Sequence, residues 1–160
     1  MVIYYGLYVY NSLVYWGVYS MIDWLIFLAL GVIILATYLD LKYKAVPSVF
    51  LSGLVFVCLL MRPHNLLFGI ILLVFGIMIK DLIHDVAGMD FGNADLKILV
   101  VIGLLFASSH VMMWFMIIFA ILQFAYTTLW RTFISKEDHI PFIPCLLAIF
   151  ITLLLTGGFA

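Results

Sequence analysis

Residues 92–97 read Gly92-Asn93-Ala94-Asp95-Leu96-Lys97, and they stand directly before an apolar run that continues to Ala107. The Asp-Leu-Lys triplet also occurs upstream, where Asp40-Leu41-Lys42 closes another apolar run. An ionised carboxylate at the edge of a hydrocarbon segment is costly and is rarely placed there without a use. The chain has only eight acidic residues, and two of them occupy such positions. We therefore expect Asp40 and Asp95 to form a functional pair.

The composition predicts a membrane protein. Of the 160 residues, 68% are hydrophobic and 9% are charged, whereas about 25% of residues are charged in soluble domains. A water-soluble fold of this length cannot bury so much apolar surface, so we expect lipid as the solvent. The net charge of −1 gives no basis for nucleic-acid binding. The two cysteines form no CxxC pair, and we expect neither a metal nor a cofactor.

The apolar runs predict an all-α, polytopic membrane protein with one domain over residues 1–160 and a helical core over residues 24–155. The six expected spans are Trp24–Leu39, Ser48–Met61, Leu66–Ile79, Leu96–Ala107, Val111–Trp130 and Ile140–Leu155. Residues 1–22 contain six tyrosines, and tyrosine prefers the lipid–water boundary. This segment is predicted to be either an interfacial helix or a seventh span. Pro47 before Ser48 suits the start of a helix.

The basic residues predict the topology. When the six spans alternate, six of the seven Lys and Arg residues fall on one side, which is therefore cytoplasmic. Asp40 ends a helix that runs toward that side, and Asp95 begins a helix that runs away from it. Both acids are thus expected at the same depth, near the cytoplasmic face.

Such a pair has a defined chemistry. Two close carboxylates cannot both ionise cheaply, so they share one proton. The ionised member takes a proton from water, and the protonated member donates to the scissile carbonyl oxygen. Lys42 and Lys97 are expected to anchor helix ends at the phosphate layer. Gly92 is expected to permit a tight turn beside the substrate.

Other interpretations stay open. Asp95 also suits a helix cap, and Asp81 with Asp85 suits a solvated amphipathic turn. Membrane carboxylates also serve proton- or cation-coupled transporters and channels. A non-catalytic assembly subunit is a further alternative, and it predicts that Asp40→Asn and Asp95→Asn are harmless.

Three segments resemble the type IV prepilin peptidases and archaeal preflagellin peptidases, which are membrane aspartic peptidases of the GxGD kind. Asp40-Leu41-Lys42-Tyr43-Lys44-Ala45-Val46-Pro47 is similar to the segment that follows the first catalytic helix of that family. Gly92-Asn93-Ala94-Asp95-Leu96-Lys97 is similar to its Gly-x-Gly-Asp-x-Lys signature, with Ala94 in place of the second glycine. Ile140-Pro141-Phe142-Ile143-Pro144 resembles the Pro-aromatic-x-Pro that opens a late helix.

The resemblance implies that Asp40 and Asp95 are catalytic, with Gly92, Asn93, Ala94, Lys42, Lys97 and Pro47 as supporting motif residues. It implies a multi-pass enzyme of the cytoplasmic membrane. The substrate would be a prepilin or a preflagellin (prearchaellin) precursor, with a short basic leader in the cytoplasm and an apolar helix in the membrane lipid. A further hypothesis is that Asp81, Asp85 and Asp90 attract the basic leader.

Overall fold

The computed structural model describes residues 24–43, 45–87, 92–133 and 141–159. Within these ranges the named elements are all helical, which confirms the predicted all-α class for the described residues. They are a first helix Trp24–Tyr43, α2 (Ser48–Met61), the 3₁₀ turn η1 (Pro63–Asn65), α3 (Leu66–Ala87), α4 (Asn93–Leu105), α5 (Ser109–Phe133) and α6 (Ile143–Leu155). The tyrosine-rich start lies outside the described residues.

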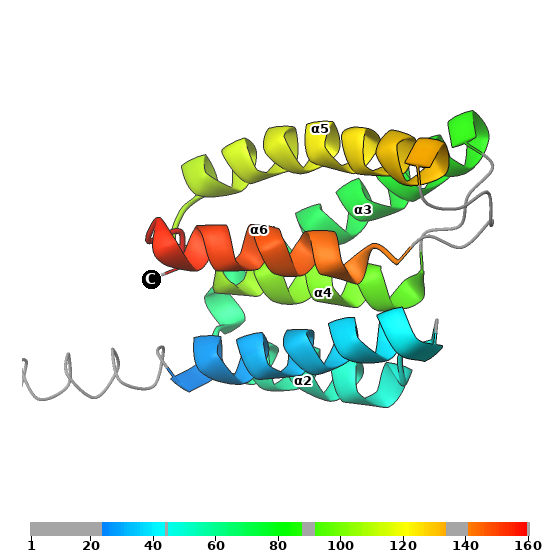
Figure 1. Cartoon of the computed structure of the whole chain (residues 1–160). Helices are drawn as coiled ribbons and strands as arrows, with labels where there is room; N and C mark the ends of the chain where they lie inside the picture. The colour runs from blue at the N-terminus through cyan, green and yellow to red at the C-terminus, as the bar shows by residue number, and fades with distance from the viewer. Residues whose placement is uncertain (1–23, 44, 88–91, 134–140, 160) are drawn as a thin grey trace, which may run out of the picture.

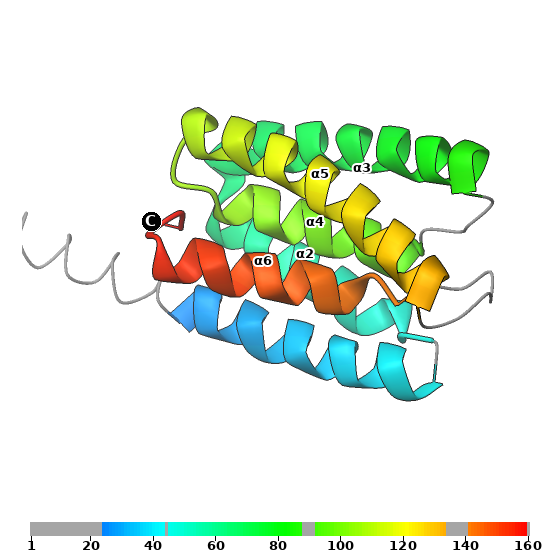
Figure 2. The same ribbon diagram turned by 45° about the horizontal axis from the view of Figure 1, so that its top comes forward.

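Helix α4 lies at the centre of the bundle, between the layer of α2 and the layer of α3 and α5 (Figures 1 and 2). It contacts α2, α3, α6 and η1. Most of its residues are buried, including Ile98, Leu99 and Ile102, which have no exposed surface. An apolar helix that is buried all round belongs to the interior. The helix that begins at the organising stretch is therefore the core of the fold.

Glycine permits the close approach of α3 and α4. A Cβ atom added at Gly103 would lie 2.8 Å from the carbonyl oxygen of Phe68 and 2.9 Å from the Cα atom of Gly69. On α3, a Cβ atom at Gly76 would lie 2.8 Å from the side chains of Leu96 and Leu99. Small residues at helix contacts let two backbones approach closely, as is common within membranes.

The C-terminal end of α4 is capped by side chains from the turn after α2. The Asn65 Nδ2 atom donates to the carbonyl oxygens of Leu104 and Phe106, both at 2.9 Å. The buried Arg62 guanidinium donates to the carbonyl oxygen of Leu105 at 3.2 Å. The last carbonyls of a helix have no partner within the helix. The sequence predicts only a turn here, whereas the structure shows a polar cap on the central helix.

Two predicted helix ends are wrong. The first helix continues past Leu39 to Tyr43, so Asp40 and Lys42 lie within its last turn rather than after its end. Helix α3 continues past Ile79 to Ala87. The reason is that Ile79 and Ile83 are both buried and continue the apolar face of α3 beneath the polar residues that follow.

The expectation of six spans is met only in part. Three helices among the described residues are long and apolar enough to cross a membrane, namely Trp24–Tyr43, Pro63–Asp85 and Ser109–Phe133. Helices α2, α4 and α6 have 14, 13 and 13 residues. At 1.5 Å per residue each reaches only about 20 Å, against about 30 Å of hydrocarbon.

The outer faces are nevertheless strongly apolar. Large apolar side chains are exposed along the whole of α3, at Leu66, Leu67, Ile70, Leu73, Val74, Ile77, Met78 and Leu82. Soluble monomers rarely expose contiguous apolar patches of this extent. Together with the three long helices, this surface indicates a membrane-associated protein.

Candidate active site

Asp40 and Asp95 meet at one end of the bundle. Asp40 lies in the last turn of the first helix and Asp95 in the first turn of α4, and they are only 6% and 5% exposed. The charge of Asp40 acts directly on Asp95. In Figure 1 the last turns of the first helix, α3 and α5 lie at the same end as the first turns of α4 and α6. We call this end of the bundle the carboxylate end. Asp40 and Asp95 both lie there, as their positions in the sequence predict.

The two oxygens of Asp95 have different surroundings. The Oδ2 atom accepts a hydrogen bond from the Gly92 backbone N–H at 2.9 Å, and the Asp95 N–H donates to the Gly92 carbonyl at 3.1 Å. This is a helix cap, so the cap interpretation is confirmed for Oδ2. The Oδ1 atom is buried and has no hydrogen-bond partner among the described residues. One oxygen therefore fixes the side chain, and the other keeps its hydrogen-bonding capacity unused within the described part of the chain.

Burial and charge together set the protonation of Asp95, which lies outside the three helices long enough to span a membrane. Burial, and then the negative charge of Asp40, raise the pKa of Asp95 to about 8. The hydrogen bond from the Gly92 N–H opposes this rise without cancelling it. Burial and the charge of Asp40 therefore favour the protonated form of Asp95 near neutral pH.

Gly92 leaves space for the Asp95 carboxylate and does not adopt an unusual backbone conformation. Its φ of −72° is accessible to any residue, so the predicted tight turn is not what requires glycine. A Cβ atom at Gly92 would instead lie 3.0 Å from the Oδ2 atom of Asp95. Of the two residues between them, Asn93 is exposed, and Ala94 is partly buried against the hydrophobic core. An apolar residue at position 94 therefore suits this structure.

Lys97 forms hydrogen bonds with the start of α2, and its predicted role as an anchor at the phosphate layer stays a prediction. Its Nζ atom donates to the Ser52 Oγ at 2.7 Å and to the Ser48 carbonyl at 3.2 Å, and it also contacts the Ser48 Oγ. Pro47 immediately precedes α2, as its sequence context predicts. Lys97 thus ties the start of α4 to the start of α2.

Lys42 has the exposed position expected of an anchor. Its Nζ atom donates to the Tyr38 hydroxyl at 3.0 Å and lies 5.1 Å from the ring centroid of Tyr43. On α3, Asp81 and Asp85 are exposed, as the amphipathic interpretation expects, and Asp90 lies outside the described residues. Within the described ranges, no three His, Cys, Asp or Glu side chains are grouped so as to hold a metal ion.

Tyr126 of α5 is a site residue that the sequence analysis missed. Its hydroxyl donates to the Pro141 carbonyl at 2.9 Å, which joins α5 to the segment before α6. The ring lies within electrostatic range of both Asp40 and Asp95. In the sequence, Tyr126 is one of nine tyrosines, and no spacing distinguishes it from the others.

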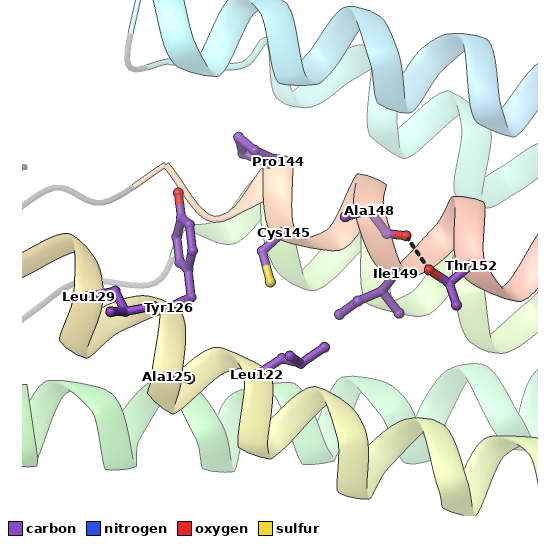
Figure 3. Close-up of a pocket in the computed structure, with 9 residues that line it drawn as sticks. All are labelled: Leu122, Ala125, Tyr126, Leu129, Pro144, Cys145, Ala148, Ile149 and Thr152. Atoms are coloured by element: carbon purple, nitrogen blue, oxygen red, sulfur yellow. Dashed lines mark hydrogen bonds between the residues drawn. The ribbon is translucent and has the colours of Figure 1, made fainter.

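An apolar groove runs between α5 and α6 and begins beside Tyr126 (Figure 3). Its first part has a volume of about 420 Å³ and is lined by Leu122, Ala125, Tyr126, Leu129, Pro144, Cys145, Ala148, Ile149 and Thr152. A second part of about 290 Å³ shares Leu122, Ile149 and Thr152 and extends to Thr156. The groove therefore follows most of α6, with one end at the carboxylate end.

No protein-family model, curated protein or solved structure matches this chain. The family resemblance stays a hypothesis. What the structure adds is that two buried carboxylates interact electrostatically at the end of the bundle where the apolar groove begins.

Proposed function

We propose that this protein is a membrane aspartic endopeptidase that removes the basic leader from prepilin-like or preflagellin (prearchaellin) precursors. The observation that carries the proposal is the buried pair of Asp40 and Asp95, which come from separate helices and interact electrostatically. The substrate class rests on the resemblance of residues 40–47 and 92–97 to the GxGD peptidases.

In the proposed reaction the two acids have different roles. In its ionised form Asp40 takes a proton from a water molecule, and the water oxygen attacks the scissile carbonyl carbon. Asp95, which is protonated, donates through its unpartnered Oδ1 to the carbonyl oxygen. Collapse of the tetrahedral intermediate breaks the C–N bond, Asp40 gives its proton to the leaving amine, and one hydroxyl of the intermediate returns a proton to Asp95. The Gly92 N–H holds Oδ2 throughout.

The groove between α5 and α6 supports a membrane-embedded substrate. Its lining is almost wholly apolar, and Tyr126, which lines one end, is within electrostatic range of both carboxylates. An apolar precursor helix in this groove would present the junction with its leader to the acids. Helices α2 and α6 and the part of α4 after Asp95 would then complete the six-span arrangement, with Asp95 at the edge of its span. Within this arrangement α2, α3 and α6 cover α4. The positive-inside rule puts the carboxylate end at the cytoplasmic face.

A proton- or cation-coupled transporter and a non-catalytic assembly subunit are the competing hypotheses. Both predict that the chain does not hydrolyse peptides. A transporter would also use buried carboxylates, so the position of the acids alone does not separate it from a peptidase. Cleavage of a defined precursor distinguishes a peptidase from both alternatives.

The test is co-expression with an epitope-tagged prepilin and, separately, a tagged prearchaellin, followed by the size shift on a gel. The intact chain is expected to remove the leader. Asp40→Asn and Asp95→Asn are each expected to abolish cleavage at normal protein levels, because each removes one half of the proton transfer. Asp81→Asn removes an exposed carboxylate on α3 and is the matched control, with cleavage retained. Cleavage by either active-site variant would refute the assignment.

A further inference from the structure

Gln123 is a polar side chain sealed inside α5. It is 0% exposed, and its Oε1 and Nε2 atoms have no hydrogen-bond partner among the described residues. Burying an amide without partners costs several kcal/mol in an apolar medium. The neighbouring buried residue Thr127 avoids this cost, since its hydroxyl donates to the Gln123 carbonyl at 2.8 Å. The Gln123 side chain has no such hydrogen-bond partner within the described residues.

The buried face of α5 changes character along its length. Its first half is apolar, with Met112, Phe115 and Phe119 buried. Its second half is polar, with Gln123 and Thr127 buried and the Trp130 Nε1 atom buried without a partner among the described residues. Since α5 ends at the carboxylate end (Figure 1), the polar half of this face lies on the side of Asp40 and Asp95.

Helix contacts place Gln123 at about the depth of Asp95. One turn before it, Phe119 packs on Phe75 of α3, with ring centroids 6.1 Å apart. The next residue of α3, Gly76, faces Leu96 and Leu99 of α4. Four residues of α5 advance about 6 Å, toward the carboxylate end. Gln123 is therefore level with the first turn of α4, where Asp95 lies.

A peptidase at this depth must satisfy the backbone of its substrate. A peptide bond inside a helix is shielded, so the substrate has to unwind around the cleaved bond. Each backbone N–H and C=O freed in this way needs a partner, because hydrocarbon supplies none. An amide side chain offers both a donor and an acceptor, which matches a peptide group.

We infer that Gln123 binds the unwound backbone of the substrate next to the cleaved bond through its Oε1 and Nε2 atoms. The ligand class is an extended peptide segment, and the inference rests on the proposed peptidase function. The Gln123 amide would make no hydrogen bond in the free enzyme and would bond to the substrate backbone in the complex. A helical ligand, whose own backbone is satisfied, gains nothing from it.

The test compares Gln123→Leu with the matched variant Thr127→Val, which changes a satisfied polar residue on the same buried face. Binding of a fluorescent, uncut prepilin and of its processed product is measured in the inactive Asp95→Asn background. Gln123→Leu is expected to weaken binding of the uncut precursor about tenfold, the worth of one or two hydrogen bonds, and to leave product binding unchanged. In the active enzyme, cleavage falls by a similar factor. Thr127→Val leaves all three measurements unchanged.

Equal binding of the uncut precursor with and without Gln123 would overturn the inference. An equal loss for precursor and product would overturn it too, because that result indicates structural damage. If Gln123→Leu does not fold, Gln123→Met, which keeps the length of the side chain, takes its place; failure of both to fold makes the amide structural and refutes the binding role. Failure of the unmodified enzyme to cut any precursor refutes the proposed function instead, whereas equal cutting by enzyme and variant refutes only this inference.

Discussion

Gly103→Ala is predicted to destabilise the fold, because α3 and α4 touch through backbone at this position. The added Cβ would lie 2.8 Å from the Phe68 carbonyl oxygen, and 2.9 Å and 3.0 Å from the Cα and N atoms of Gly69. Ordinary contacts need about 3.5 Å, so the helices must move apart by about 0.5–1 Å. A gap of that size removes a quarter to a half of the dispersion energy of each contact that it opens. Overpacking a core lowers the free energy of unfolding by about 1–3 kcal/mol.

The matched control is Gly53→Ala on α2, where an added Cβ meets no atom within 4 Å. Both substitutions gain about 1 kcal/mol of helix propensity, so their difference isolates the clash. We expect the Tm of Gly103→Ala to lie roughly 5 °C below that of Gly53→Ala, since 1 kcal/mol corresponds to about 2–4 °C at this chain length. Thermal unfolding in detergent, followed by tryptophan fluorescence, measures both. Equal Tm values would refute a backbone contact between α3 and α4.

Three further predictions concern the carboxylate end and the far end of α4. Burial and Asp40 raise the pKa of Asp95 in the folded state, so the folded protein retains a proton that the unfolded chain releases. This group therefore lowers the stability of the fold as pH rises from about 4 to about 8. The gain in Tm from Asp95→Asn should be larger at pH 8 than at pH 5, and a gain independent of pH would contradict the raised pKa. Cleavage should persist at neutral pH and fall above about pH 8 as the pair loses its proton, whereas a decline that begins near pH 5 would contradict Asp95 as the acid. Asn65→Leu leaves two carbonyls of the α4 terminus unpaired and should cost about 2–3 kcal/mol in thermal unfolding, while His64→Ala, at the exposed neighbouring residue, should have little effect.

The order of the helices and the pairing of the acids follow from the sequence, because both depend on simple alternation. Apolar runs separated by polar turns fix the number of helices in the described part of the chain. Alternating direction then brings the end of the first helix and the start of α4 to the same end of the bundle. Two acids at those positions lie at the same end of the bundle, and there Asp40 acts electrostatically on Asp95.

The sequence does not show the direction in which each polar side chain points. Lys97 is expected to be a lipid anchor, and the sequence does not show that its Nζ atom donates to Ser48 and Ser52. Gln123 is visible as a single polar residue in the apolar run of α5. Its full burial depends on how α5 packs in the bundle, which no local pattern encodes. Arg62 and Asn65 read as turn residues, since their hydrogen-bond partners lie about 40 positions away in the chain.

The length of α4 explains why these hidden contacts matter. A helix of 13 residues is too short to match a bilayer by itself, and one exposed to lipid would leave its terminal backbone groups unpaired. Here α2, α3 and α6 cover its sides, Arg62 and Asn65 satisfy its last carbonyls, and the Asp95 carboxylate accepts from the Gly92 N–H at its start. The protein rather than the bilayer therefore fixes where α4 begins. Since Asp95 is itself part of that first turn, the same contacts that make a short central helix possible also hold the acid opposite Asp40.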